Sequence, residues 1–297
     1  MATEVPTYDQ IELAIGRWAA SQPDVRAIVA LGSRTHTEHS ASEWSDLDLM
    51  IISGQPGELA ARTDWLMSIG EVQFIAREPL ARDEWIPLVV ILSGMRKVDI
   101  VLTVIPAVCQ PHNNLGLILA ASPYPYVFSD GFKVLYDRYP SNVGLELPTY
   151  LSYVPRLPTH DEFNNDVNLF WVRAIHVATL IRRGEQWRAC HQLQVELKSI
   201  LLSFIERQAR LRYGPVYKIW PRGCYLNDWA DPRAVAELPG CFAANPTGEL
   251  WDALRATCKL FHWLAVNIAE KLGFTYPQAS EDYSREWIKR VDPSHLL

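Results

Sequence analysis

The chain lacks the features that would place it among secreted, disulfide-rich or membrane proteins. Its 297 residues include only five cysteines, which are odd in number, widely spaced and never in a C-x-x-C pair. This excludes a readable disulfide framework or zinc site. No stretch has 18 uncharged apolar residues, and the N-terminus lacks the basic and apolar regions of a secretory signal. We therefore expect a cytoplasmic protein with no membrane contact.

The chain also lacks an excess of basic residues. It has 28 Lys and Arg against 34 Asp and Glu, a net charge of −6. Residues 1–150 contain 10 basic and 18 acidic side chains, whereas residues 151–297 contain 18 and 16. The acidic first half argues against a nucleic-acid-binding surface and suits a site for cations, either metals or polyamine-like ligands. A solvated acidic face is the alternative explanation.

Hydrophobic spacing predicts an α/β arrangement in the first half. Residues 8–21 have helical spacing, and residues 57–69 read as a second helix. Five short apolar runs, bounded by turn-forming residues, predict the strands of a compact mixed sheet: 26–31, 47–53, 71–77, 87–92 and 97–104.

The second half has a different pattern. Its apolar residues recur at the spacing of long helices, which predicts a bundle of helices over about 161–183, 185–211 and 247–272. Residues 140–158 hold four prolines and no sustained period, so we place a domain boundary there, between domains 1–150 and 151–297. Residues 213–248 look loop-like. The expected fold class is α+β, an N-terminal mixed sheet followed by a helical bundle.

Three aspartates form the most informative pattern in the chain. Asp46 and Asp48, two residues apart at the start of a predicted strand, point to the same face. Carboxylates that close repel, and one would be protonated near neutral pH unless a cation lies between them. Asp99 lies in another predicted strand, so the three carboxylates converge if the two strands adjoin. Oxygen ligands without His or Cys favour a hard cation such as Mg²⁺.

A Gly32-Ser33 turn follows the first predicted strand. It offers backbone N–H groups, a small hydroxyl and close approach, which suit an anionic phosphate. A G-S turn or a D-x-D pair alone is common on exposed strand ends. Their combination with a third aspartate, in this order, resembles the polymerase-β-type nucleotidyltransferases.

The resemblance extends to one family over most of the chain. The sequence is similar to the aminoglycoside 6-adenylyltransferases, the streptomycin-modifying enzymes. The matching segments are Gly32-Ser33-Arg34-Thr35 with Asp46-x-Asp48, Lys97-Val98-Asp99-Ile100, Val134-Leu135-Tyr136-Asp137, Glu162-Phe163, Asn168, Phe170-Trp171, Arg183-Gly184-Glu185, Tyr217-Lys218 and Tyr276-Pro277.

The resemblance implies Mg²⁺-dependent transfer of AMP from ATP to a hydroxyl of an aminoglycoside, with release of pyrophosphate. It implies two Mg²⁺ ions with Asp46, Asp48 and Asp99 as ligands, and Asp99 as the general base. Gly32 and Ser33 would hold the triphosphate. The first domain would then bind metal and nucleotide, and the helical domain the acceptor.

Four further charged side chains are candidate site residues. Arg34 would help to neutralise the triphosphate, and Lys198 and Lys218 are either further triphosphate partners or solvated surface lysines. Glu185 opens a predicted helix, so its carboxylate either matches the helix dipole or faces the acceptor. In the second case it binds the cationic groups of the acceptor or replaces Asp99 as the base.

One departure from the family keeps other functions open. The residue after Asn168 is typically Glu in the family, and here it is Leu169, which removes a carboxylate that could meet a cationic sugar. The acceptor could then be another small hydroxyl compound or a protein side chain. A third hypothesis is a non-enzymatic nucleotide-binding or antitoxin-like module, but such a module has no need for three converging carboxylates.

Overall fold

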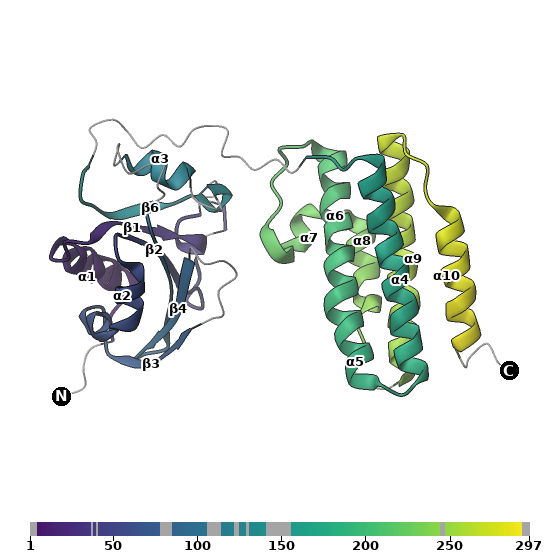
Figure 1. Cartoon of the computed structure of the whole chain (residues 1–297), viewed down its shortest axis with the longest axis horizontal. Helices are drawn as coiled ribbons and strands as arrows, with labels where there is room; N and C mark the ends of the chain where they lie inside the picture. Colours follow the sequence, from purple (N-terminus) through teal and green to yellow (C-terminus); the bar gives the residue numbers. More distant parts are fainter. Residues whose placement is uncertain are drawn as a thin grey trace. The chain divides into compact units, whose positions relative to one another are not determined.

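The computed structural model forms two compact units, Met1–Tyr153 and Val154–Leu297. The first contains a mixed sheet and the second is helical, which confirms the predicted α+β class (Figure 1). Within the part of the chain that the structure describes, no helix is long and apolar enough to span a bilayer. The described residues are 5–36, 38–39, 41–77, 85–105, 114–121, 125–128, 131–140, 156–243 and 247–292.

The sheet of the first unit has six strands in the order β3-β4-β5-β2-β1-β6. Only the β2–β5 pair is parallel among the described strands. All five predicted strands form, and β6 adds a sixth that was not predicted because its short run is bounded by Lys133 and Asp137. The strands are β1 (Val25–Leu31), β2 (Leu47–Ser53), β3 (Val72–Arg77), β4 (Trp85–Leu92), β5 (Arg96–Thr103) and β6 (Lys133–Asp137).

Apolar side chains on both faces of the sheet hold its centre rigid. In β1, Ile28 packs on the side of α1, and its neighbour Val29 packs with α3 and η4 on the other side. Alternation of this kind follows from the two-residue period of a strand. The helical elements of this unit are α1 (Tyr8–Ala20), η1 (Gly32–Arg34), α2 (Pro56–Ala61), η2 (Asp64–Ser68), α3 (Leu115–Ala120) and η4 (Pro125–Phe128).

The single helix predicted over 57–69 is wrong in one respect, because the chain leaves the helical conformation at Arg62. The break lets η2 turn so that Trp65 stacks on Trp18 of α1, with ring centroids 4.4 Å apart. Burial of two large aromatic surfaces therefore outweighs helix continuity here.

The second unit is a bundle whose long helices have the predicted positions (Figure 1). Phe170 of α4 stacks on Phe261 of α9, with centroids 3.5 Å apart, at the centre of the core. The predicted helix 185–211 forms as three consecutive segments, of which η6 is π-helical. The long elements are α4 (His160–Arg182), α5 (Gln186–His191), η6 (Gln192–Leu197), α6 (Lys198–Tyr213), α9 (Thr247–Leu272) and α10 (Gln278–Val291).

The stretch predicted as a loop over 213–248 is helical in part, because its described residues from Pro221 to Cys241 do not form a loop. They form short helices that bury Trp220, Trp229 and Cys241 against the bundle. Helices this short show no sustained apolar period, and two of them begin at Pro232 and Leu238-Pro239, which composition alone assigns to turns. The described helices in this stretch are η7 (Pro221–Gly223), α7 (Leu226–Trp229), α8 (Pro232–Glu237) and η8 (Leu238–Cys241).

Candidate active site

Three aspartate carboxylates converge at one end of the β2–β5 pair. The two strands are parallel neighbours, and Asp48 lies directly opposite Asp99. Asp46 lies just before β2. One carboxylate oxygen from each residue lies within 4.8 Å of the other two, and all three side chains are partly exposed. The adjoining strands that the sequence analysis required are therefore present, and the three aspartates share one site.

The electrostatics of this cluster favour a bound cation. Burial raises the pKa of the Asp48 carboxyl to about 7, and the negative charges of Asp46 and Asp99 add to the shift. Lys97 opposes it by lowering the same pKa. A cation among the carboxylates removes the repulsion that keeps one of them protonated.

Lys97 is the member of this site that the sequence analysis missed. Its Nζ donates hydrogen bonds to Oδ2 of Asp46 at 2.8 Å and to Oδ2 of Asp99 at 2.7 Å. Burial lowers the pKa of Lys97, but the bonds to the two aspartates raise it by more, so the net shift is upward. The available signal was its place two residues before Asp99, which puts both side chains on the same face of a strand.

The turn after β1 lies against the carboxylate cluster and depends on glycine. Gly32 has φ of +71°, and a Cβ at this position would lie 2.1 Å from Oδ2 of Asp48. The Thr35 hydroxyl holds the turn by hydrogen bonding at 2.9 Å to the carbonyls of Gly32 and Gly131. Ser33 follows Gly32 in this turn, within η1, and its contact with a triphosphate stays a prediction.

Arg34 contacts other residues of the first unit. Its guanidinium donates to the carbonyls of Ser45 at 3.3 Å and Asp46 at 3.1 Å, and it lies over the ring of Tyr8 at 3.7 Å from the centroid. These contacts fix the segment that leads into β2. The geometry therefore favours a positioning role, in which Arg34 holds the backbone of Asp46, and its contact with a triphosphate stays a prediction.

The residues of the cluster fit a hard divalent cation. All of the converging donors are carboxylate oxygens, the ligand type that Mg²⁺ prefers. Among the described residues, Oδ1 of Asp99 is buried and has no hydrogen-bond partner. A buried acceptor without a partner is costly, and an ion would satisfy it.

The other predicted site residues belong to the second unit. The Glu185 carboxylate lies between two arginines, 2.7 Å from Nη2 of Arg183 and 2.5 Å from Nη1 of Arg188. It precedes α5 but makes no capping hydrogen bond to the helix backbone. Both carboxylate oxygens are thus paired with arginine, and a role of Glu185 toward an acceptor stays a prediction.

Lys198 is turned into the bundle rather than into solvent. Its Nζ donates to the hydroxyl of Thr257 at 2.8 Å, and Thr257 is fully buried. Burial lowers the Lys198 pKa to about 8, while the nearby thiols of Cys241 and Cys258 oppose the shift. This geometry is that of an internal lysine joining α6 to α9 and not of a solvated surface lysine; its contact with a triphosphate stays a prediction.

Lys218 and Glu185 lie at opposite ends of one helical stretch. The Lys218 ammonium lies over the Trp220 ring, 4.0 Å from its centroid, beyond the end of α6. From α5 through α6 the chain is helical from Gln186 to Tyr213 (Figure 1), a length of about 40 Å. Both residues lie outside this stretch, and their contacts with an acceptor or a triphosphate stay predictions.

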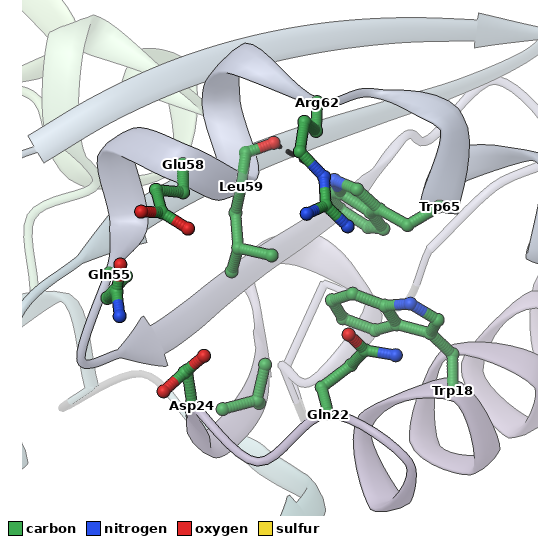
Figure 2. A pocket seen from close by; sticks show the side chains of 9 residues that line it. Trp18, Gln22, Asp24, Gln55, Glu58, Leu59, Arg62 and Trp65 are labelled. Atoms are coloured by element: carbon green, nitrogen blue, oxygen red, sulfur yellow. Dashed lines mark hydrogen bonds between the residues drawn. The ribbon is translucent and has the colours of Figure 1, made fainter.

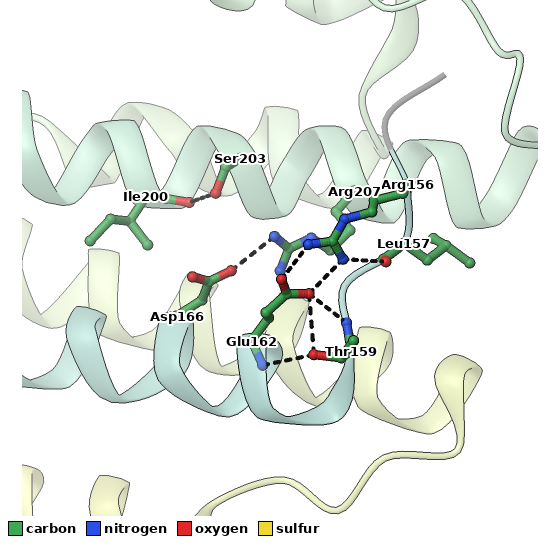
Figure 3. Close-up of polar contacts among 8 residues, drawn as sticks. All are labelled: Arg156, Leu157, Thr159, Glu162, Asp166, Ile200, Ser203 and Arg207. Carbon is green, nitrogen blue, oxygen red and sulfur yellow. Dashed lines mark hydrogen bonds and ion pairs between the residues drawn. The ribbon is translucent and has the colours of Figure 1, made fainter. Parts of the chain in front are cut away.

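The start of α4 explains part of the family resemblance structurally. Glu162 accepts a hydrogen bond from the Thr159 backbone N–H in a capping box and pairs with Arg156 (Figure 3). These bonds, that of Arg156 first, lower the Glu162 pKa to about 2. Next to it, Asp166 pairs with Arg207 of α6 at 3.0 Å. The Glu-Phe pair of the family motif thus begins α4 and anchors it, since Phe163 is fully buried.

A separate pocket lies away from the aspartates. The stacked rings of Trp18 and Trp65 form one side, and Asp24, Glu58 and Arg62 line the rest (Figure 2). It lies beside the start of β1 and the residues after β2, whereas the carboxylate cluster lies beside the end of β1. Seven residues of strand separate the two, about 20 Å. The pocket is therefore not part of the candidate active site.

Comparisons with known proteins agree on one family. A family model described as streptomycin adenylyltransferase matches residues 7–291. The aminoglycoside 6-adenylyltransferase of Bacillus subtilis (strain 168) is 21% identical over 276 residues, 90% of this chain and 92% of that protein. The protein of the same name from Campylobacter jejuni is 21% identical over 296 residues, 98% and 96% of the two chains. A solved aminoglycoside 6-adenyltransferase from Bacillus subtilis aligns with a TM-score of 0.41 and 16% identity, over 97% of this chain and 99% of that one.

Proposed function

Because the chain belongs to the streptomycin adenylyltransferase family, a family of nucleotidyltransferases, we propose that it transfers AMP from ATP to a hydroxyl of an aminoglycoside. The supporting observation is the convergence of Asp46, Asp48 and Asp99 beside the Gly32-Ser33 turn. In-line attack on a nucleotide requires carboxylates that can hold a metal ion, next to a turn whose backbone N–H groups can hold phosphate.

In the proposed reaction the acceptor oxygen attacks the α-phosphorus of ATP, and the bond to the pyrophosphate oxygen breaks. Asp46, Asp48 and Asp99 would hold Mg²⁺, which when bound neutralises phosphate charge and acidifies the attacking hydroxyl. Asp99 accepts the hydroxyl proton. Gly32 and Ser33 hold the triphosphate through backbone N–H groups and the Ser33 hydroxyl.

The acceptor is proposed to be a polycation, because the first half of the chain has 18 acidic against 10 basic residues. Streptomycin is the first candidate, since the family model is described by it. Glu185, between its two arginines, is a candidate for a cationic group of the acceptor. Leu169, which is 41% exposed on α4, stands where the family typically has Glu, so this position offers no carboxylate to a cationic sugar. The test therefore includes other acceptors.

The test is a substrate panel read by mass spectrometry. The protein is incubated with Mg²⁺, each of the four nucleoside triphosphates and streptomycin, spectinomycin, kanamycin or lincomycin. A nucleoside-monophosphate adduct on an aminoglycoside, together with pyrophosphate release that needs the acceptor, is the expected result. Absence of an adduct on every aminoglycoside would refute the proposed acceptor class. An adduct on another hydroxyl compound would support the broader transferase alternative.

A further inference from the structure

The register of two strands places a lysine inside the acidic cluster. In the parallel β2–β5 pair, Leu47 lies opposite Val98 and Asp48 opposite Asp99. One residue earlier, the same register sets Asp46 level with Lys97, on the same face as the other two carboxylates. The cluster therefore consists of three carboxylates and one ammonium group.

The ammonium group of Lys97 pairs with two of the three carboxylates that would hold a metal ion. It lies 2.8 Å from Oδ2 of Asp46 and 2.7 Å from Oδ2 of Asp99. Mg²⁺ binds carboxylate oxygens at about 2.0–2.1 Å, so an ion on these oxygens would be within a few ångströms of the ammonium. Two cations at that separation repel strongly.

The Lys97 side chain can leave while its backbone stays. Its backbone N–H donates to the hydroxyl of Tyr8 at 3.3 Å, and Tyr8 is buried beneath the guanidinium of Arg34. The Lys97 side chain itself is 44% exposed. Withdrawal of the ammonium into solvent would therefore not disturb the strand that positions Asp99.

We propose that Lys97 is a positioning residue that exchanges with the metal ion. Without metal, its ammonium lies between the Asp46 and Asp99 carboxylates and holds them close together. An incoming divalent cation displaces it from both oxygens. This inference rests on the proposed function for the identity of the ion, but its consequence is a property of metal binding alone. Lys97 competes with the metal, so its removal must tighten metal binding.

The experiment measures Mn²⁺ binding to the full chain by calorimetry at pH 8, without nucleotide or acceptor. Lys97→Met removes the ammonium and keeps a side chain of similar length. Its Kd for Mn²⁺ should be at least about tenfold lower than that of the wild type. Lys133→Met is the matched control, because Lys133 pairs with Glu12 at 2.6 Å and not with a carboxylate of the cluster. The Kd of this variant for Mn²⁺ should equal that of the wild type.

Tightening by less than threefold, or weaker binding, in Lys97→Met would overturn the proposal, because a purely structural lysine gives that result. Absence of Mn²⁺ binding in wild type and variant alike would refute both the proposal and the metal-dependent function. Absence of adenylyl transfer by the wild type, with the tightening in Lys97→Met intact, would refute the proposed function alone.

A second measurement uses the wild-type protein and does not depend on the folding of a variant. Amine acetylation at each lysine is followed by mass spectrometry with and without Mn²⁺. Acetylation of Lys97 should become at least about threefold faster with Mn²⁺, because the amine leaves its two carboxylate partners, while that of Lys133 should not change. An unchanged rate at Lys97 would contradict displacement.

Discussion

Gly32→Ala tests whether the turn after β1 sets the position of the Asp48 carboxylate. The new Cβ would lie 2.1 Å from Oδ2 of Asp48, whereas ordinary contact begins at 3.4 Å, so one of the two must move by about 1.3 Å. The backbone φ of +71° adds the left-handed penalty of an L-residue, about 1–2 kcal/mol. That strain should lower Tm by about 2–8 °C in a unit of this size.

The larger effect should be on turnover. Misplacement of a catalytic group by about 1 Å costs on the order of a hundredfold, so kcat for pyrophosphate release should fall by about that factor in a coupled assay.

Alanine substitutions at two further glycines distinguish the effect of backbone strain from the effect of displacing Asp48. Gly273 also has a positive φ, +68°, but a Cβ there meets nothing within 4 Å. Gly273→Ala should therefore lose similar stability and keep its kcat. Gly57 has open space and no positive φ, so Gly57→Ala should be neutral or slightly stabilising. A Gly32→Ala enzyme within threefold of the wild-type kcat would refute the claim that Gly32 is required to place Asp48.

Three further outcomes follow from the same structure. Asp48→Asn should lower turnover at least several hundredfold in the acceptor-dependent pyrophosphate assay, because one of the three metal ligands loses its charge. The same variant should change the pH dependence of stability without divalent metal. The Asp48 pKa is raised from 3.8 to about 7 in the fold, so its favourable contribution is complete below pH 4 and is lost as the pH rises to about 7. Urea unfolding should then show Asp48→Asn more stable than the wild type above pH 7, on the order of 4 kcal/mol, with no difference near pH 4. Asp137→Ala should cost about 3–5 kcal/mol in urea unfolding, because it removes the carboxylate from Arg26 in a buried pair whose side chains are 2% and 9% exposed. A loss below 1 kcal/mol would contradict the buried pairing.

The first unit was the more predictable because most of its strands are short segments rich in apolar residues. Each such segment, including 47–53, reads as a strand with or without its neighbours. The order of the strands is not readable in this way, because it depends on which edges meet in space. The convergence of Asp48 and Asp99 was therefore conditional on the parallel β2–β5 pairing, and the resemblance to a family supplied the condition that the spacing could not.

The role of Lys97 was hidden for a related reason. Its partner Asp46 is 51 residues away in sequence, and only the strand register places the two side chains level. The i, i+2 relation to Asp99 was visible, but an alternating Lys-x-Asp strand more often faces solvent than another carboxylate. The role of the Lys97 charge therefore depends on a strand pairing that is set by the whole sheet.

The second unit shows the reverse difficulty, in which long helices are easily predicted but the environment of their polar residues is not. Periodicity places Lys198 on a helix, yet whether its amine faces solvent depends on the short helices η7 to η8, whose sequence reads as a loop. Those helices bury Cys241 beside Thr257 and so surround the amine. Glu185 differs, because Arg183 and Arg188 are near it in sequence and their pairing could have been read from the R-G-E-x-x-R spacing.

The charge of the carboxylate cluster connects the acidic first half to the proposed chemistry. Asp46, Asp48 and Asp99 with the ammonium of Lys97 have a formal charge of −2 when all are ionised. An ion that displaces Lys97 adds two positive charges at the cluster, and the displaced ammonium can then pair with another anion. In the proposed reaction a triphosphate held at the Gly32-Ser33 turn would be such an anion, since that turn lies against Asp48. Metal and nucleotide should then favour each other's binding, because the same lysine that opposes the metal alone gains a partner when the nucleotide is present.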